Sequence, residues 1–359
     1  MSPFSKEKLE RLKKLAEGNF LESSNEKINK FLKRMEIEGA PVFADVYSGE
    51  MSFYNAPKNN KLNDIDIAII GVPMEISAPV RGGTRLGPRS AREWSKVRGP
   101  VHDVWRTIPF EMCSVADYGD IIFEDPHNVV SCVNHLSSVY SDIKNAGVRP
   151  LSIGGVHTMT HPILRGLSNK KGIGLVHIDS HADTAKGSFQ GSPINDCSVF
   201  LNAVLEESID PEKCIQIGIR GSLTPYWDFS RQSGMTVIEM HEYLEMGLEN
   251  VIKKIHKVIG DNPFYLSIDT DAIDATFLPG TQLPEPFGFT TREIIQMLRK
   301  LKGMDIIGAD IVELCPPYDP HGISANIVAA IGFEILCLLA ESHTRKFGVK
   351  RKTSWSKKN

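Results

Sequence analysis

Residues 173–183 read IGLVHIDSHAD, and this stretch decides the fold. Its first part, Ile173–Ile178, is a nearly continuous apolar run with the length of a buried strand. The residues that follow are polar, and every second one, Asp179, His181 and Asp183, is a potential ligand. A short apolar strand that ends in a polar cluster is typical of an open α/β sheet, where ligands gather at the carboxyl ends of the strands.

Similar runs recur along the chain, and most are followed by Gly, Asp or Asn and then by a segment of helical period. Besides Ile173–Ile178, strands are expected at Ile65–Val72, Pro150–Ile153, Cys214–Ile219, Thr236–Glu239, Phe264–Ile268 and Ile306–Val312. The helical segments include Asn128–Ala146, Thr291–Leu301 and Ile323–Leu339. This alternation predicts an α/β fold with three layers, α/β/α, around a mainly parallel sheet of roughly eight strands.

The chain is expected to divide into three parts. Residues 1–61, in which Lys6–Glu17 and Ser24–Glu36 are charged and helical in period, form an N-terminal extension that packs on the body or on a neighbouring subunit. Residues 62–345 carry the alternating strands and helices and form one domain. Residues 346–359 form a basic tail that is expected to be solvated.

Composition argues against several classes of protein. A net charge of −3 over 359 residues gives no sign of a nucleic-acid or acidic-lipid partner. The N-terminus lacks the apolar segment of a secretory signal, and the apolar run Ile327–Ala340 is too short to span a bilayer. Six cysteines are spread singly, as in reduced proteins. We therefore expect a cytoplasmic protein without a nucleic-acid or membrane partner.

Two further polar clusters follow expected strands. Pro150–Ile153 runs into a glycine pair and then His157, and Phe264–Ile268 runs into Asp269 and Asp271. Parallel strands end at a common edge of their sheet. These side chains and the cluster quoted above are therefore expected to lie close together.

Packing does not readily explain these residue types. In an extended segment, Asp179, His181 and Asp183 point to one side of the chain. Carboxylates are rarely buried unless they are paired or bind a metal, and Asp269 and Asp271 would repel each other without a cation between them. A single Asp in such a place is more often a loop-end cap or a solvated turn, but the joint pattern favours a metal site.

Four carboxylates and two imidazoles can hold two divalent ions. The predicted ligands are His157, Asp179, His181, Asp183, Asp269 and Asp271. Oxygen and nitrogen donors without a thiolate suit Mn²⁺ best, and they also suit Ni²⁺, Co²⁺ or Zn²⁺. Two ions a few ångströms apart lower the pKa of a shared water, which makes a hydroxide available at neutral pH.

The motifs along residues 62–345 resemble those of the ureohydrolase family, which includes arginase, agmatinase and related guanidino hydrolases. In chain order they are RGGTRLGP (81–88), GGVH (154–157), HIDSHADT (177–184), QIGIRG (216–221), SIDTDAID (267–274), PGT (279–281) and VELCPP (312–317). Several separate motifs in the right order make the match specific. The last two look more like the agmatinase branch than arginase itself.

The resemblance implies an arginase-like fold and a role for each cluster. The implied ligands are His157, Asp179, Asp183 and Asp269 for one metal, and Asp179, His181, Asp269 and Asp271 for the other. Asp179 and Asp269 would bridge, and Asp183 would also orient the hydroxide. Glu313, directly after the strand Ile306–Val312, would pair with the substrate, since a planar guanidinium prefers a carboxylate in fork geometry. Attack on the guanidinium carbon would release an amine and urea.

Two positions depart from the family pattern. The family usually carries an acidic residue where this chain has Val156, and the change is expected to alter metal preference. The family often places a histidine, thought to shuttle protons to the leaving amine, within the segment that corresponds to residues 185–200. None occurs there, and Asn195 and Asp196 stand in its place. Asp196 can act as an acid or contact substrate if burial raises its pKa, and the alternative is a helix N-cap.

The sequence therefore predicts a binuclear-metal hydrolase that cleaves a guanidino compound to urea plus an amine or ammonia, in an agmatinase-like reaction. Free guanidine, methylated guanidines and guanidino acids remain alternative substrates. Another alternative is a catalytically weak subunit that supports an active paralogue. A one-metal amidohydrolase such as a deacetylase is disfavoured by the number of carboxylates. The family resemblance implies a homotrimer or homohexamer.

Overall fold

The computed structural model describes residues 3–18, 21–40, 50–76, 78, 80–168, 170, 172–188 and 191–356. The chain forms two compact units, one made of Met1–Val42 with Trp355–Asn359 and the other of Phe43–Ser354. Compact packing does not by itself test a domain boundary. The expected division after residues 61 and 345 therefore stays a prediction.

The smaller unit contains two helices, α1 (Lys6–Ala16) and α2 (Glu26–Ile37). Each begins at a polar N-cap whose side chain accepts a hydrogen bond from the first turn, Ser5 for α1 and Asn25 for α2. In α2 the side chain of Phe31 is buried, and its ring centroid lies 6.3 Å from that of Trp355. The charged, helix-period segments of the N-terminal extension are thus helices.

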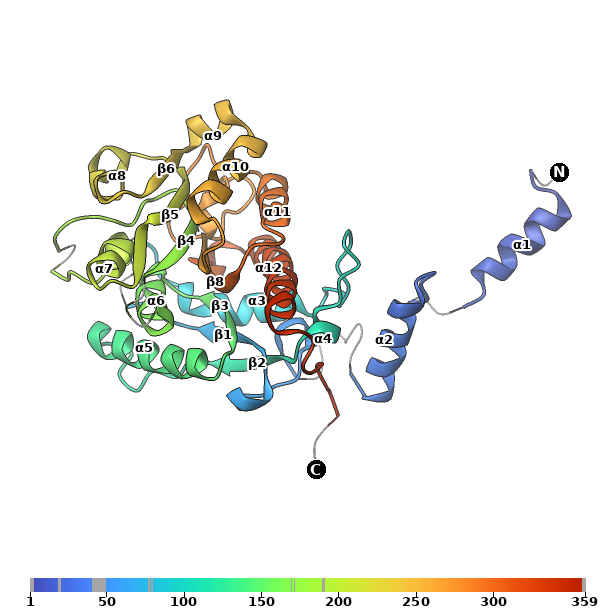
Figure 1. Ribbon diagram of the computed structural model, residues 1–359. Coiled ribbons are helices and arrows are strands. Elements are labelled where there is room, and N and C mark those ends of the chain that lie inside the picture. Colours follow the sequence, from blue (N-terminus) through green and yellow to red (C-terminus); the bar gives the residue numbers. More distant parts are fainter. Residues whose placement is uncertain are drawn as a thin grey trace. The chain divides into compact units, whose positions relative to one another are not determined.

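The larger unit is built on one sheet of eight strands in which every neighbouring pair is parallel (Figure 1). The strands are β1 (Ile67–Val72), β2 (Val115–Asp120), β3 (Arg149–Gly154), β4 (Ile173–Ile178), β5 (Ile209–Ile219), β6 (Thr236–Glu239), β7 (Phe264–Asp269) and β8 (Ile306–Val312). Their order across the sheet is β2-β1-β3-β8-β7-β4-β5-β6. All residues of β1, β3, β4 and β7 are buried, as expected when helices cover both faces.

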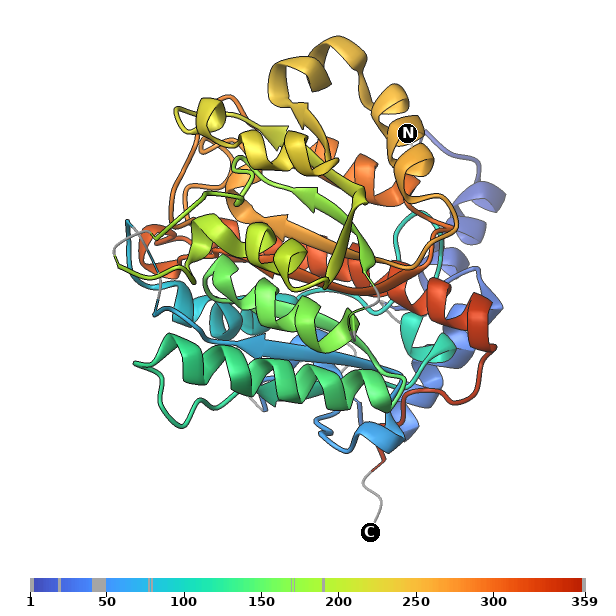
Figure 2. The ribbon, with the colours of Figure 1, turned by 60° about the vertical axis from the view of Figure 1, so that its left-hand side comes forward.

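Helices cover the sheet on both sides (Figure 2). They are α3 (Gly87–Ser95), α4 (Pro109–Met112), α5 (Val129–Asn145), α6 (Thr160–Ser168), α7 (Val199–Leu205), α8 (Asp228–Ser233), α9 (Met240–Met246), α10 (Leu248–Ile259), α11 (Thr291–Lys300) and α12 (Ile323–Phe347). In Figure 2 the green helices α5 and α6 pack together in front of the sheet, and the red α12 lies behind it, against β8, α3 and α11. The expected α/β fold with three layers is confirmed.

Helix α12 is long and apolar enough to cross a membrane by length and composition, and no other helix in the described ranges is. However, 78% of its most apolar window is buried inside the protein. The segment behaves as the central helix of one layer, as its contacts with β8 and β3 require.

One strand is missing from the sequence prediction. β2 contains Asp117, Gly119 and Asp120, a composition more typical of a turn than of a strand. It forms the edge strand of the sheet beside β1, and residues 57–59 bridge to it at Asp117. Asp117 is nevertheless buried, because Arg92 Nε on α3 donates a 2.9 Å hydrogen bond to its carboxylate.

A polar link between α6 and the end of α7 predicts an acid-sensitive contribution to stability. Glu206 accepts hydrogen bonds from Arg165 at 2.6 and 2.7 Å and lies 2.9 Å from His161 Nε2. Burial alone would raise the pKa of Glu206, but His161 and Arg165 lower it to about 2. The stabilisation is therefore present above the unfolded-state value, about 4.5, and is lost as the pH falls towards 2.

We expect Glu206→Gln to lower the free energy of unfolding by about 1 kcal/mol at pH 7, a value discounted for the partial exposure of the pair. Urea unfolding at pH 7 and pH 3 measures the effect, and the difference between wild type and variant should shrink at the lower pH. An equal difference at both values would contradict this account.

Candidate metal centre and substrate pocket

The predicted site residues lie at the carboxyl ends of four adjacent strands, β3, β8, β7 and β4. Asp179 follows the last residue of β4, Asp269 ends β7, and Glu313 follows β8. His157 stands three residues beyond β3, after Gly155, whose added Cβ would lie 2.2 Å from the main-chain oxygen of Met74. Only a glycine lets this loop pass so close to the neighbouring segment at Met74. The loop in turn directs His157 over the sheet.

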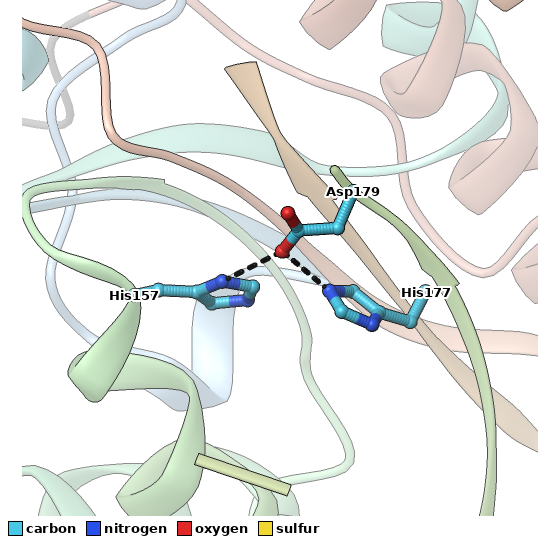
Figure 3. Close-up of side chains that lie close together, drawn as sticks. All are labelled: His157, His177 and Asp179. Carbon is cyan, nitrogen blue, oxygen red and sulfur yellow. Dashed lines mark hydrogen bonds and ion pairs between the residues drawn. The ribbon is translucent and has the colours of Figure 1, made fainter. Parts of the chain in front are cut away.

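One half of the site surrounds His157. Its Nδ1 lies 3.2 Å from Asp179 Oδ2, 3.0 Å from Asp183 Oδ2 and 3.4 Å from Asp269 Oδ2. This nitrogen is buried and has no hydrogen-bond partner among the described residues. Figure 3 shows the imidazole of His157 facing the carboxylate of Asp179. A lone-pair atom among three carboxylate oxygens is the arrangement that a divalent cation bound by these groups requires.

The other half surrounds His181. Its Nδ1 lies 3.0 Å from Asp271 Oδ2 and 3.7 Å from Asp179 Oδ1. Asp179 therefore turns one oxygen towards each histidine, as a bridging ligand must. The six predicted ligands converge on one place, and each is at most 9% exposed. Their roles as metal ligands stay a prediction.

The carboxylates of this cluster are electrostatically unbalanced. Burial raises the pKa of Asp269 well above its usual range, and the nearby Asp271 and Asp179 carboxylates raise it further. Across the described ranges, no lysine or arginine forms an ion pair with any of the six residues. Buried carboxylates without a cationic side chain are stable as anions only beside another cation. The residues present therefore fit a pair of divalent ions.

Behind His157 lies a hydrogen-bonded chain that the sequence interpretation missed. His157 Nε2 lies 3.0 Å from Ser267 Oγ, and Ser267 in turn donates a 2.6 Å hydrogen bond to Asp310 Oδ1. Because the Ser267 hydroxyl gives its hydrogen to Asp310, it accepts the proton of Nε2, and in the neutral imidazole Nδ1 is then the nitrogen that has a lone pair for a metal ion. The sequence signal is Asp310 itself, a carboxylate inside an apolar strand.

A second supporting residue, His177, precedes Asp179 by two positions (Figure 3). Gln216 Nε2 donates to His177 Nδ1 at 3.0 Å and also to the main-chain oxygen of Ala182 at 2.7 Å. His177 Nε2 is therefore the protonated nitrogen, and it donates to Asp179 Oδ2 at 2.7 Å. This bond fixes the orientation of the bridging carboxylate. His177 and Gln216 are polar residues within expected apolar strands, which is the signal that could have identified them.

The loop after β4 reaches the site by a different geometry from the one expected. Residues 179–183 are not in a strand, and Asp183 has a left-handed φ of +51°. Glu313 also has a left-handed φ, +67°. Such conformations cost about 1–3 kcal/mol for a non-glycine residue and concentrate at functional sites. Asp179, His181 and Asp183 therefore converge across a bend at Ser180 and His181, and not along a regular strand as expected.

Glu313 presents a free carboxylate oxygen to the pocket. Its Oε1 accepts a 2.5 Å hydrogen bond from the main-chain N–H of His157. Its Oε2 is buried and has no hydrogen-bond partner among the described residues. Burial and the nearby Asp196 and Asp269 carboxylates raise the pKa of Glu313 well above its usual range. A cationic ligand that donates to Oε2 would satisfy this atom and favour the ionised form.

The motif at residues 81–88 supports this wall of the pocket. Arg81 donates to the main-chain oxygens of Thr281, at 2.8 Å, and Gln282, at 2.9 Å. Gln282 in turn donates its main-chain N–H to the main-chain oxygen of Glu313 at 3.2 Å. This motif therefore positions the loop beside Glu313.

Asp196 is also brought to the site, but not as an N-cap. Asn195 caps the short helix Asp196–Ser198, and its side chain accepts from Cys197 N. Asp196 instead accepts hydrogen bonds from the Thr158 main-chain N–H, at 3.2 Å, and from the Thr158 hydroxyl. The alternative interpretation of Asp196 as a helix N-cap is wrong, because the preceding residue makes that bond.

These groups line an open pocket whose empty space, with the solvent at its mouth included, is about 390 Å³. The residues that line it are His157, His181, Asp183, Asp196, Cys197, Leu223, Trp227, Asp269, Asp271, Gln282, Leu283 and Glu313. The carboxylates and imidazoles converge there with the apolar side chains of Leu223, Trp227 and Leu283. Such a pocket can hold metal ions beside a small cationic ligand.

Comparisons with known proteins agree with this geometry. Guanidinopropionase of Pseudomonas aeruginosa is 38% identical over 301 residues, which cover 83% of this chain and 94% of that protein. Agmatinase of Chromobacterium violaceum is 34% identical over 311 residues, covering 86% of this chain and 94% of that protein. The solved structure of proclavaminate amidino hydrolase from Streptomyces clavuligerus superposes with a TM-score of 0.79 at 30% identity, over 83% of this chain and 100% of that one.

The sequence profile of the arginase family matches residues 65–338. The matched range contains all eight strands of the sheet and every predicted site residue. On this match, and on the relatives above, the chain belongs to the arginase family.

Proposed function

We propose that the chain is a binuclear-metal ureohydrolase that cleaves a guanidino compound to urea and an amine, in an agmatinase-like reaction. The observation that carries the proposal is Glu313 Oε2, a buried oxygen without a partner among the described residues, in the same pocket as the predicted metal ligands. A guanidinium is the cation whose planar N–H groups best match such a carboxylate.

Within this proposal, His157, Asp179, Asp183 and Asp269 hold one ion, and Asp179, His181, Asp269 and Asp271 hold the other. Bound divalent ions lower the pKa of a shared water and so supply a nucleophile at neutral pH. The nitrogen and oxygen donors favour Mn²⁺, with Ni²⁺ as the alternative. Val156, which is fully buried and apolar, offers no polar group beside His157.

The chain's own residues would orient the substrate and move the proton. Glu313 fixes the plane of the guanidinium, so that its carbon faces the metal ligands. Asp183, whose Oδ2 lies beside His157 Nδ1, accepts the proton that the attacking water loses and returns it to the leaving nitrogen. Collapse of the tetrahedral carbon then releases urea and the amine.

A urea-release panel tests the proposal. The full chain is loaded with Mn²⁺ or Ni²⁺ and given agmatine, guanidinopropionate, guanidinobutyrate, guanidine and methylguanidine. The guanidino acids are included because one relative described above is a guanidinopropionase. We expect urea from at least one compound. A loaded chain that releases none, even when mixed with a candidate active paralogue, would contradict the proposal. Activity that appears only in the mixture would favour the supporting-subunit alternative.

Metal removal gives a second expected outcome. Dialysis against a chelator should abolish urea release, and the buried carboxylates should then lose part of their stabilisation, so that the melting temperature falls. Re-addition of Mn²⁺ or Ni²⁺ should restore both quantities. The proposal fails if activity survives in chain shown by elemental analysis to be free of metal.

We also propose a cytoplasmic location and a homotrimer or homohexamer. Light scattering during gel filtration measures the assembly, with about three or six times the 39.8 kDa of one chain as the expected mass. A monomer at micromolar concentration would contradict this part.

A further inference from the structure

Two carboxylates bind consecutive main-chain N–H groups at the pocket. Glu313 Oε1 accepts from His157 N at 2.5 Å, and Asp196 Oδ1 accepts from Thr158 N at 3.2 Å. Successive N–H groups at the start of a helical turn lie close together, so the two carboxylates lie side by side. Both line the pocket, and each is at most 7% exposed.

The position of Asp196 is fixed from two sides. The Thr158 hydroxyl donates to Oδ1, and Gln282 Nε2 lies 3.5 Å from Oδ2. Gln282 also donates its main-chain N–H to the main-chain oxygen of Glu313, so the same residue contacts the Asp196 carboxylate and the Glu313 backbone. These contacts hold Asp196 in a single orientation beside Glu313. The cap of its own helix is supplied by Asn195, and the Asp196 side chain bonds Thr158 instead.

If the four Asp ligands are balanced by two divalent ions, the negative charges of Asp196 and Glu313 remain to be balanced by the substrate. Two divalent ions would balance the four Asp ligands. One guanidinium then faces two carboxylates, which leaves an excess of one negative charge. Among the described residues that line the pocket there is no lysine or arginine, and its apolar wall includes Leu223, Trp227 and Leu283. An anionic tail would meet repulsion without a cationic side chain to bind it.

We propose that Asp196 is a second substrate-binding carboxylate, which with Glu313 forms a cradle for one guanidinium and selects compounds whose tail carries no negative charge. The planar guanidinium has N–H groups along more than one edge. Glu313 accepts two hydrogen bonds from one edge in fork geometry, and Asp196 accepts a hydrogen bond from the adjacent edge. The substrate class is a guanidine with a short uncharged or cationic substituent. This inference rests on the proposed function.

Asp196→Asn tests the cradle against Asp261→Asn, a matched control at an exposed turn before β7. Kinetics use the best substrate among agmatine, guanidine and methylguanidine. Guanidinobutyrate is compared as a substrate or as a competitive inhibitor. We expect Asp196→Asn to raise KM about tenfold, with a smaller change in kcat, and to strengthen the relative binding of guanidinobutyrate about tenfold. The control should change neither.

Metal content and melting temperature of Asp196→Asn should match those of the wild type, which separates lost substrate binding from misfolding. Should that variant fold poorly, Thr158→Val removes the hydroxyl that orients Asp196 while keeping volume, and it should raise KM in the same direction. An Asp196→Asn enzyme with unchanged KM and unchanged tail preference overturns the inference, as does a wild type that prefers guanidino acids. Both results leave urea release, and so the proposed function, intact. A wild-type enzyme that releases no urea would contradict both the inference and the proposed function.

Discussion

Asp179→Ala should lower urea release by at least about 1000-fold, the largest effect expected of any single change. Its two carboxylate oxygens face the two histidines of the site, at 3.2 Å and 3.7 Å, so under the proposed metal assignment the variant would remove a ligand from both ions. It also leaves His177 Nε2 without its acceptor. Elemental analysis should show that the purified variant has lost most of its metal.

Asp261→Ala is the matched control for this change. It removes a carboxylate of the same size from an exposed turn at the opposite edge of the sheet, and both activity and metal content should stay at wild-type values. If Asp179→Ala kept both ions and near-normal activity, the assignment of a bridging role to Asp179 would be wrong.

Glu313→Gln should lower kcat/KM by roughly 100- to 1000-fold while the metal content stays unchanged. The amide keeps an oxygen that can accept from His157 N, so the local fold is preserved. It replaces the buried anionic fork by a neutral group, and the guanidinium loses its charge-assisted partner. Steady-state kinetics and elemental analysis on the same preparation measure both quantities.

The control here is Glu245→Gln, an exposed glutamate on α9. A loss of metal in Glu313→Gln that accounts for the whole loss of rate would move Glu313 from substrate binding to support of the metal centre. Equal rates in Glu313→Gln and wild type would remove it from the reaction.

The sheet follows from the sequence because its strands are buried on both faces. β4, β6 and β8 have the expected bounds. For β4 and β8 the reason is that a mainly apolar run is bounded by polar residues or glycine. β2 is not predicted, because its Asp117 is unusual in a strand. Its position at the sheet's edge and the ion pair with Arg92 make Asp117 acceptable there, and neither feature can be seen in a single sequence. The predicted helix Ile323–Leu339 extends to Phe347 in the structure, because the charged residues of its last turns do not interrupt a helix.

The predicted metal ligands can be identified from their spacing in the sequence, but the residues that hydrogen-bond to them and orient them cannot. Ser267 and Asp310 lie on neighbouring strands in register with each other, and only that pairing makes them a relay behind His157. His177 stands out in the sequence as a polar residue in an apolar strand, but its role in orienting Asp179 becomes visible only when Gln216 is placed beside it. The role of Asp196 likewise depends on Thr158, which is distant in the chain and adjacent only in space.

The order of strands has a consequence for biosynthesis. β8, which is followed by Glu313, lies between β3 and β7 in the middle of the sheet, although it is the last strand along the chain. A nascent polypeptide that still lacks residues 306–313 therefore has a gap between the loop bearing His157 and the loop bearing Asp269. If the proposed metal centre forms, we expect it to form only after nearly the whole chain has left the ribosome, and C-terminal truncation before β8 should yield a product that cannot assemble it.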